Sequence, residues 1–328
     1  MHALISIVIV NWNAGDLLER CVASVLTQTL PPLEVIVVDN GSSDGSARHI
    51  GEKFNSVSVI HAGENIGFAA ANNLAVRNVS RKCSWIVLLN PDAFPEPTWL
   101  ESLFDAAQRN LEYAFFGCRL MDAINPLIVD GTGDTYHSSG LVWRAGHGKS
   151  FNSPVVEFKE IFSPCAAAAM YRKDVFLEAG GFDEDFFCYV EDVDLGFRLR
   201  LLGHRCLYVP GSVVYHVGSA VTGRRSDFSV YHGHRNLVWT FTKNVPGFLF
   251  WVLLPLHLAL NIVTVIYFAL HGQSSVIWRA KRDAIKGIPK MWRKRRRIQS
   301  TRVATPREIW RLMYKGLIPA KQGRIGRH

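Results

Sequence analysis

Short runs of β-branched and aliphatic residues alternate with segments of helical periodicity in the first part of the chain. The runs predict buried strands, because strands covered on both faces are apolar throughout rather than alternating. Strands that alternate with helices predict an α/β fold with a mostly parallel sheet flanked by helices. The predicted strands are 4–10, 34–38, 57–61 and 85–89, and the predicted helices are 16–27, a segment through 72–77, and 98–107.

The pattern loosens between residues 113 and 162, where the glycine-rich stretches 130–134 and 146–148 predict loops at the edge of an active site. A strand of small residues is expected over 162–171 and a short helix over 174–178. Two further strands are expected over 206–210 and 213–217.

Three carboxylates open a predicted helix that begins near residue 191. Val193, Phe197 and Leu201 recur at helical spacing and predict one apolar face. Acids favour a helix N-terminus through the macrodipole, so a purely structural reading is available. Asp194 is four residues from Arg198 and predicts a helix-surface ion pair. The other two acids, Glu191 and Asp192, are therefore the candidates for a catalytic role.

Glu191 and Asp192 are adjacent, and neighbouring carboxylates repel each other. One of them is therefore expected to have a raised pKa, which suits proton abstraction near neutral pH. We take Asp192 as the candidate general base and Glu191 as its neighbour.

Polar side chains follow the predicted strands at Asn11, Asp39, Asn90 and Asp92. Ligands bind open α/β sheets at these strand ends. Asp39 suits a nucleoside contact and Asp92 a metal ion, since a cation between two phosphates needs few protein oxygens. Both segments also read as simple turns. The chain has neither a GxGxxG motif after its first strand nor a Walker-type phosphate loop.

Two basic positions later in the chain are further candidates. His216 ends a predicted strand and suits a metal or phosphate role, although a lone histidine is commonly a core residue. Arg235 lies in the polar stretch 231–236, which reads either as a clamp for a diphosphate or as a solvated loop.

The net charge of +9 is concentrated late in the chain, above all in the basic run 290–297. The six cysteines form no CxxC pair, which excludes a zinc or redox signature and indicates reduced core residues. The first residues lack the pattern of a signal peptide. We therefore expect the bulk of the protein to be cytosolic.

Residues 246–270 are strongly apolar and about as long as a membrane span, which needs roughly 20 residues. Basic residues flank both sides, a distribution that disfavours a single span. We expect two half-helices broken near Pro255 that re-enter or lie on an anionic membrane surface, with a soluble core helix as the alternative. This predicts a catalytic domain over 1–240 and a membrane-associated region over 241–328. Nucleic-acid binding is disfavoured, because no base-reading module is visible.

With these residues in place, the chain resembles the family 2 glycosyltransferases, inverting enzymes of the GT-A fold, and is most similar to their rhamnosyltransferase-like branch. The resemblance covers about 5–239 and is carried by six motifs in order. These are VNWN at 10–13, VVDNGS at 37–42, NIGFA at 65–69, LNPD at 89–92, GGFDE at 180–184 and EDVD at 191–194.

The resemblance implies a nucleotide-sugar site and a metal site. It implies that Asp39 holds the nucleoside and that Asp92 binds a divalent metal, Mg²⁺ or Mn²⁺, with His216 completing that site. It implies Asp192 as the base. The other positions assigned to the nucleotide-sugar site are Asn11, Asn13, Asn65, Gly67, Asn90 and Arg235.

The implied reaction is direct displacement at the anomeric carbon, with rhamnose from dTDP-rhamnose as the first expectation and a polyprenyl-linked or glycan acceptor. A place at the cytoplasmic face of the membrane follows from the C-terminal region. The alternatives are a polyprenyl-phosphate sugar synthase, which needs no general base, and a catalytically inactive nucleotide-binding scaffold.

Overall fold

The computed structural model describes residues 4–151, 157–218 and 226–317. Its centre is a sheet in which four parallel strands lie in the order β4-β1-β2-β3. These strands are β1 (Ile5–Asn11), β2 (Glu34–Asp39), β3 (Val57–His61) and β4 (Trp85–Leu89). They match the four strands that the sequence predicts, although most residues of β3 are exposed or half-buried, and their carboxyl ends meet at one edge of the sheet.

The sheet continues beyond β4 in mixed orientation, through β11, β6, β12 and β10. The strand β11 (Ala168–Arg172) runs antiparallel to both β4 and β6 (Tyr113–Asp122), whereas β12 (Arg205–His216) is parallel to β6. The sequence predicts two strands here, 206–210 and 213–217, whereas the structure has the single strand β12 with a register irregularity between Val209 and Val213. The smaller strands are β5 (Ala93–Pro95), β7 (Val129–Gly131), β8 (Asp134–Tyr136), β9 (Val142–Arg144) and β10 (Lys159–Glu160).

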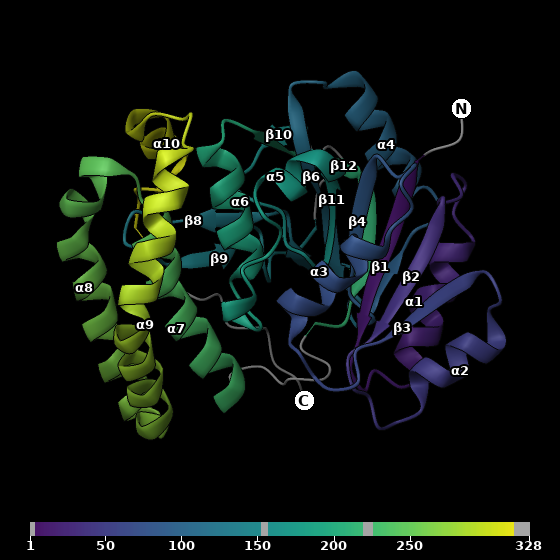
Figure 1. Cartoon of the computed structure of the whole chain (residues 1–328), viewed down its shortest axis with the longest axis horizontal. Helices are drawn as coiled ribbons and strands as arrows, with labels where there is room; N and C mark the ends of the chain where they lie inside the picture. Colours follow the sequence, from purple (N-terminus) through teal and green to yellow (C-terminus); the bar gives the residue numbers. More distant parts are fainter. Residues whose placement is uncertain (1–3, 152–156, 219–225, 318–328) are drawn as a thin grey trace.

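Helices cover both faces of the sheet, which confirms the predicted α/β class with GT-A character (Figure 1). Ile7 packs into the cluster with helices α1, α2 and α4, whereas Val8 packs on the other side with α3, α5 and α6. Neighbouring residues of a strand point to opposite faces, so the continuous apolar runs follow directly from two covered faces. The helices are α1 (Asp16–Leu26), α2 (Ser46–Lys53), α3 (Phe68–Asn78), α4 (Trp99–Arg109), α5 (Lys173–Glu178), the 3₁₀ turn η1 (Glu184–Phe186) and α6 (Glu191–Leu201).

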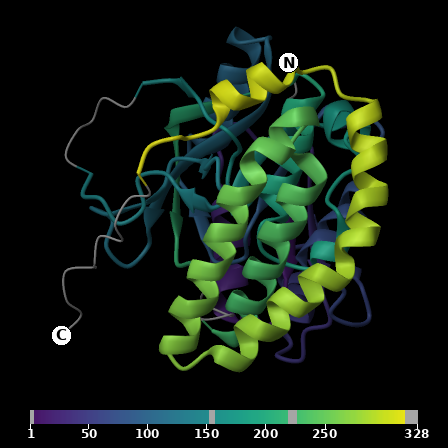
Figure 2. The same cartoon turned by 90° about the vertical axis from the view of Figure 1, so that its left-hand side faces the viewer.

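Helices α7 (Asp227–Asn244), α8 (Gly247–Leu270) and α9 (Ser274–Ser300) stand side by side at one end of the molecule (Figure 2). The short α10 (Pro306–Leu312) follows them. The apolar face predicted for α6, formed by Val193, Phe197 and Leu201, packs against this layer. The predicted domain boundary at residue 240 falls inside α7, and the division itself stays a prediction.

The expected break near Pro255 is wrong, because α8 runs uninterrupted from residue 247 to 270 with this proline inside it. Within the described residues, α8 is the one helix long and apolar enough to cross a membrane. Only 17% of its most apolar window is buried inside the structure. Most of its apolar surface therefore faces outward.

Candidate active site

A strained turn presents the acidic end of α6. Phe187, Tyr189 and Val190 have φ angles of +64°, +68° and +69°. Such values are rare for residues with a Cβ, and above all for a β-branched valine. The turn is held by Asn236 of α7, whose side-chain amide donates to the carbonyl oxygens of residues 186, 188 and 189 at 2.7–3.0 Å. Strain of this kind is retained where the surroundings impose it, which fits a functional turn.

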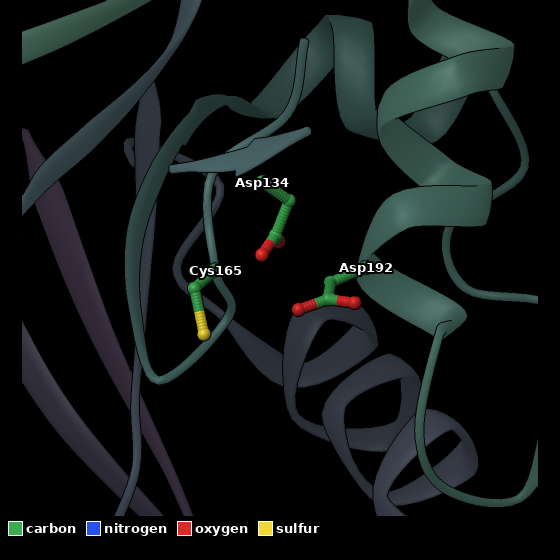
Figure 3. Close-up of side chains that lie close together, drawn as sticks. All are labelled: Asp134, Cys165 and Asp192. Atoms are coloured by element: carbon green, nitrogen blue, oxygen red, sulfur yellow. The ribbon is translucent and has the colours of Figure 1, made fainter. Parts of the chain in front are cut away.

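Asp192 points toward two side chains from distant parts of the chain (Figure 3). Asp134 comes from β8 and Cys165 from the segment before β11, and the ligand atoms of the three lie within 4.8 Å of one another. The carboxylate of Asp192 also accepts hydrogen bonds from the backbone N–H groups of Ala166 (3.1 Å) and Val193 (2.8 Å). The structure thus assembles an acidic cluster around the predicted base.

The acids of this cluster hold their protons more tightly than ordinary carboxyl groups. Burial raises the pKa of Asp192, and the two backbone hydrogen bonds oppose that rise. Burial and the neighbouring Asp192 raise the pKa of Asp134 well above its usual range. The same two causes raise the pKa of Glu191, whose buried Oε2 has no hydrogen-bond partner among the described residues. A base with a raised pKa is suited to proton transfer near neutral pH.

Asp92 and His216 lie together, with the Nε2 atom of the imidazole 3.3 Å from Oδ1 of the carboxylate. The Nδ1 atom of His216 lies 2.8 Å from Oδ2 of Asp130, and Arg144 approaches the same oxygen at 2.6 Å. Burial opposes protonation of His216, but the hydrogen bonds with both carboxylates raise its pKa to about 8. The predicted pair is therefore part of a larger buried charge network.

Asn90 completes this group at the end of β4. Its amide nitrogen lies 3.4 Å from His216 Nε2, and its buried Oδ1 atom has no hydrogen-bond partner in the part of the chain that the structure describes. Asn90, Asp92 and His216 thus offer oxygen and nitrogen donors at one strand end. Mg²⁺ and Mn²⁺ prefer the oxygen donors of such a set. The cluster of Asp134, Cys165 and Asp192 includes a thiol, which these hard cations disfavour.

Asp39 lies beside Asn11 at the ends of β2 and β1. Burial opposes its ionisation, but hydrogen bonds from His61 (3.0 Å) and Ser42 (3.0 Å) lower its pKa. The carboxylate is therefore charged and directed at the sheet edge, as a nucleoside contact requires. Asn13, with φ +51°, accepts a hydrogen bond from the N–H of Ser43 at 2.8 Å and shapes the same edge.

Asn65 and Gly67 shape the loop before α3. The Oδ1 atom of Asn65 accepts from the side chain of Asn40 and from the N–H of Gly67, each at 3.0 Å. A Cβ on Gly67 would lie 2.5 Å from the ring of Phe187, so only glycine lets the strained turn approach this loop. In the structure both residues position the backbone beside the site.

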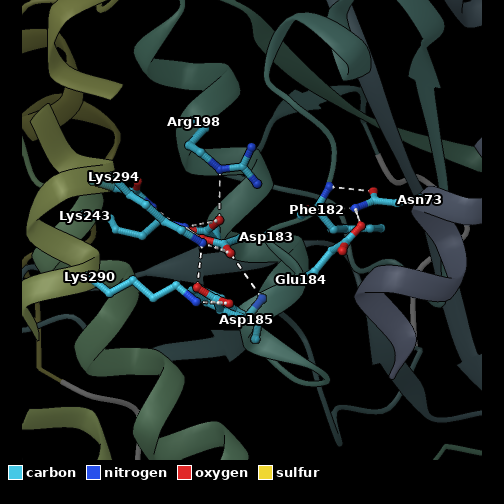
Figure 4. A network of polar contacts seen from close by, with 12 residues as sticks. Asn73, Phe182, Asp183, Glu184, Asp185, Arg198, Lys243, Lys290 and Lys294 are labelled. Carbon is cyan, nitrogen blue, oxygen red and sulfur yellow. Dashed lines mark hydrogen bonds and ion pairs between the residues drawn. The ribbon is translucent and has the colours of Figure 1, made fainter. Parts of the chain in front are cut away.

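The Asp194–Arg198 ion pair forms as predicted, with Nε 2.9 Å from the carboxylate, but its expected place on the surface is wrong. Asp194 is fully buried and also binds Lys243 of α7 at 2.9 Å. Figure 4 shows that Lys243 and Lys294 both form ion pairs with Asp183. Acids and bases of this network line a second cavity of about 870 Å³, separate from the acidic cluster. The function of Asp194 here is to hold α6 against α7.

Arg235 lies away from the strand ends. Its guanidinium donates to the carbonyl oxygens of Asp185 (3.1 Å) and Phe186 (2.9 Å) and packs over the ring of Trp239. It does not line the cavity that contains Asp192. In this structure Arg235 supports the strained turn, so its assignment as a diphosphate clamp has no geometric support.

The acidic cluster opens into a cavity of about 680 Å³. One end is lined by Asn90, Asp134 and Asp192. The other end is lined by Val230, Gly233, His234 and Leu237 of α7 and by Thr264, Tyr267 and Phe268 of α8. The cavity therefore runs from the candidate base to the inner face of the apolar helix.

Three polar residues of the site lie in the region 113–162, where the sequence pattern loosens, and two of them lie in the stretch 130–134 that is expected to be a loop. Asp130 belongs to β7, Asp134 to β8 and Arg144 to β9. The signal in the sequence for a functional role was the pair of aspartates on either side of residues 131–133. A glycine-rich stretch with aspartates is equally typical of a surface turn.

The structure combines a mixed α/β sheet, polar strand ends and a helix that begins with three acids. Residues 6–180 match the family described as Glycosyl transferase family 2, which is more than half of the chain. The chain therefore belongs to glycosyltransferase family 2.

Rhamnosyltransferases are among its relatives. The N-acetylglucosaminyl-diphospho-decaprenol L-rhamnosyltransferase of Mycobacterium tuberculosis is 29% identical over 251 residues, which cover 68% of this chain and 79% of the relative. The O-antigen chain rhamnosyltransferase RfbN of Salmonella typhimurium is 26% identical, with 65% of this chain and 66% of the relative covered.

Solved structures share the fold. The structure of GalNAc-T7 with UDP, GalNAc and Mn²⁺ matches with a TM-score of 0.59 at 17% identity, over 73% of this chain and 47% of that one. The mannosyltransferase PcManGT from Pyrobaculum calidifontis, in complex with GDP-Man and Mn²⁺, matches with a TM-score of 0.52 at 19% identity. That match covers 92% of this chain and 85% of PcManGT.

Proposed function

We propose that this protein is an inverting glycosyltransferase that moves rhamnose from a nucleoside-diphosphate donor to a hydroxyl group of a lipid-linked or cell-envelope glycan. The observation that carries the proposal is the position of Asp192. It lies in a cavity that joins the polar strand ends to the inner face of the exposed apolar helix. The rhamnosyltransferase relatives supply the sugar and the type of acceptor.

The donor is proposed to bind at the strand ends. Asp39 accepts hydrogen bonds from the nucleoside, within an edge shaped by Asn11 and Asn13. Asn90, Asp92 and His216 form the donor set for Mg²⁺ or Mn²⁺, and such an ion supplies charge stabilisation for a departing diphosphate. Asp130 orients His216 through its Nδ1 atom, as partners of metal-ligating histidines do.

The acceptor is proposed to enter from the α7 and α8 side. Its hydroxyl proton passes to the Asp192 carboxylate while its oxygen forms a bond to the anomeric carbon. The bond from that carbon to the diphosphate oxygen breaks, and the nucleoside diphosphate leaves with the electron pair. Attack from the face opposite the leaving group inverts the anomeric configuration. Burial keeps the pKa of the base high, against the two backbone hydrogen bonds that lower it.

The C-terminal helices are proposed to hold the enzyme on the cytoplasmic face of a membrane. The outward side of α8 exposes large apolar residues, which suits insertion at the acyl boundary. The basic residues of α9 suit an anionic lipid surface. The exposed apolar positions are Phe248, Trp251, Val252, Leu256, Leu258, Ile262, Val263, Ile266 and Leu270.

A donor screen tests the proposed reaction. Purified enzyme, Mn²⁺ and a membrane lipid extract are incubated with each nucleotide sugar, and nucleoside diphosphate release is measured. We expect release from dTDP-rhamnose that requires the extract, with an inverted linkage by NMR. Release without any lipid acceptor, or a product that retains the donor configuration, contradicts the proposal. Transfer that persists in the Asp192→Asn variant onto a lipid phosphate identifies a polyprenyl-phosphate sugar synthase instead.

A further inference from the structure

Lys281 of α9 is a buried cation in the helical layer. It is 9% exposed, and its Nζ atom donates to the side-chain oxygen of Asn261 at 2.6 Å and to the carbonyl oxygen of His234 at 3.2 Å. Across residues 4–151, 157–218 and 226–317, no carboxylate forms an ion pair with it. Every Asp and Glu of the chain lies within those ranges.

A buried ammonium group without a carboxylate partner is unfavourable, because two neutral oxygens replace only part of its hydration. Burial alone lowers the pKa of Lys281 to about 7. An anion placed near this group would recover the lost charge stabilisation. Unlike the paired lysines 243, 290 and 294, Lys281 has its charge available for a ligand.

Lys281 lies outside the lining of the catalytic cavity and contacts that lining through one of its hydrogen-bond partners. His234, which accepts its hydrogen bond, lines the cavity, and so does Thr264, one helical turn beyond Asn261. The rest of this end is apolar or aromatic, with Leu237, Tyr267 and Phe268. The opposite side of the same turn of α8 exposes Val263 and Ile266 to the outside.

The two ends of the cavity differ in charge. Glu191, Asp134 and Asp192 gather at one end and outnumber the cation Arg144, whose guanidinium pairs with Asp130, so an anionic group is disfavoured there. Lys281 lies behind the other end, where an anion would be attracted over a short, poorly screened distance. A ligand with a neutral hydroxyl-bearing part, an anionic link and an apolar chain therefore fits in one orientation.

We propose that the α7–α8 end of this cavity binds the isoprenoid-diphosphate part of the acceptor. The apolar chain lies against Leu237, Tyr267 and Phe268, and the diphosphate lies near Lys281. The glycan then extends toward Asp192. The identity of the ligand rests on the proposed function, whereas the site rests on the cavity and the buried lysine.

Direct binding of soluble probes tests the site without requiring sugar transfer. Farnesyl diphosphate, farnesol and inorganic diphosphate are titrated against the full chain with Mn²⁺, dTDP and UDP present in excess, so that the donor's diphosphate site is filled. We expect farnesyl diphosphate to bind more tightly than either fragment. Lys281→Gln keeps the neighbouring hydrogen bonds and should weaken farnesyl diphosphate about tenfold while leaving farnesol unchanged.

Two further variants complete the test. Thr264→Phe fills the α8 wall and should weaken farnesyl diphosphate and farnesol alike. Lys286→Gln removes an exposed cation of the same helix and should change neither. Thermal unfolding and dTDP binding report whether each variant is folded. The site is refuted if farnesyl diphosphate binds folded Lys281→Gln and Thr264→Phe as it binds the parent. Because binding is measured directly, this result is separate from a failure of rhamnose transfer.

Discussion

His216 and Asp130 form a buried pair in which the imidazole Nδ1 lies 2.8 Å from the carboxylate Oδ2. The pair turns the other ring nitrogen, Nε2, toward Asp92. A carboxylate on one nitrogen fixes the orientation of the ring and strengthens the other nitrogen as a ligand.

Asp130→Asn should therefore weaken Mn²⁺ binding about 10- to 100-fold, since partners of this kind contribute that much in metal sites. Titration with Mn²⁺, followed by electron paramagnetic resonance, measures the affinity. Asp105→Asn serves as the control, because Asp105 lies exposed on α4. An unchanged affinity in folded Asp130→Asn would remove this residue from the site.

Asp192→Asn should reduce sugar transfer by about 10²- to 10⁴-fold, the usual contribution of a positioned base. Asparagine keeps the shape, and its one oxygen can accept one of the two backbone hydrogen bonds that the two carboxylate oxygens accept in the parent. Asn236 still holds the turn, so the turn should stay intact. Nucleotide-sugar binding, measured by calorimetry, should stay within about twofold of the parent. Full turnover by this variant would exclude Asp192 as the base.

The pH profile of transfer should report the raised pKa of Asp192. The base acts in its ionised form, so activity falls as pH drops through this pKa, at a pH above the ordinary aspartate value of about 4. Asp134→Asn removes the neighbouring carboxyl group and should lower the pKa of the base. The acid limb of kcat/KM should then move to lower pH, and a limb that stays in place contradicts the coupling of the two acids.

Lys243 should stabilise the fold more than its exposed neighbour Lys290. Lys243 is buried and binds Asp194, so Lys243→Met leaves a buried carboxylate with fewer partners. We expect a loss of about 3–5 kcal/mol in the free energy of unfolding, measured by urea denaturation. Lys290→Met breaks a half-exposed pair with Asp185 and should cost less than about 1 kcal/mol. Equal effects would argue against this role of the buried network.

Membrane association should depend on the outer face of α8. The parent protein should stay with washed membranes in high salt, and Val263→Asp combined with Ile266→Asp should release it, because both side chains are exposed. Fractionation followed by immunoblotting measures the distribution. The control Glu101→Lys changes the charge on the exposed face of α4, which is far from α8 in the sequence. A parent protein that is wholly soluble without detergent would refute membrane docking by α8.

The sequence predicts local elements well, because their signals lie within a few neighbouring residues. The strands 57–61 and 85–89 agree with β3 and β4 at both ends. The apolar spacing of Val193, Phe197 and Leu201 predicts a face that does pack into a core. The wrong break at Pro255 has a local cause too, since proline disfavours a helix interior but does not forbid one.

Burial of charged groups could not be predicted, because it depends on residues far apart in the chain. Asp194 has a clear partner four residues away, and nothing local indicates that Lys243 also reaches it. The role of Arg235 changed for the same reason, since its guanidinium meets carbonyl groups from residues 185 and 186.

The sequence by itself determined the alternation of strands and helices, the polar strand ends and the acidic start of α6, because periodicity and order along the chain encode them. Only the tertiary structure decided which of these groups meet. It brought Asp130 to His216 and Asp134 to Asp192, and it set Lys281 behind the cavity wall. Such contacts follow from how the sheet and the helical layer close around one cavity, and no local pattern records them.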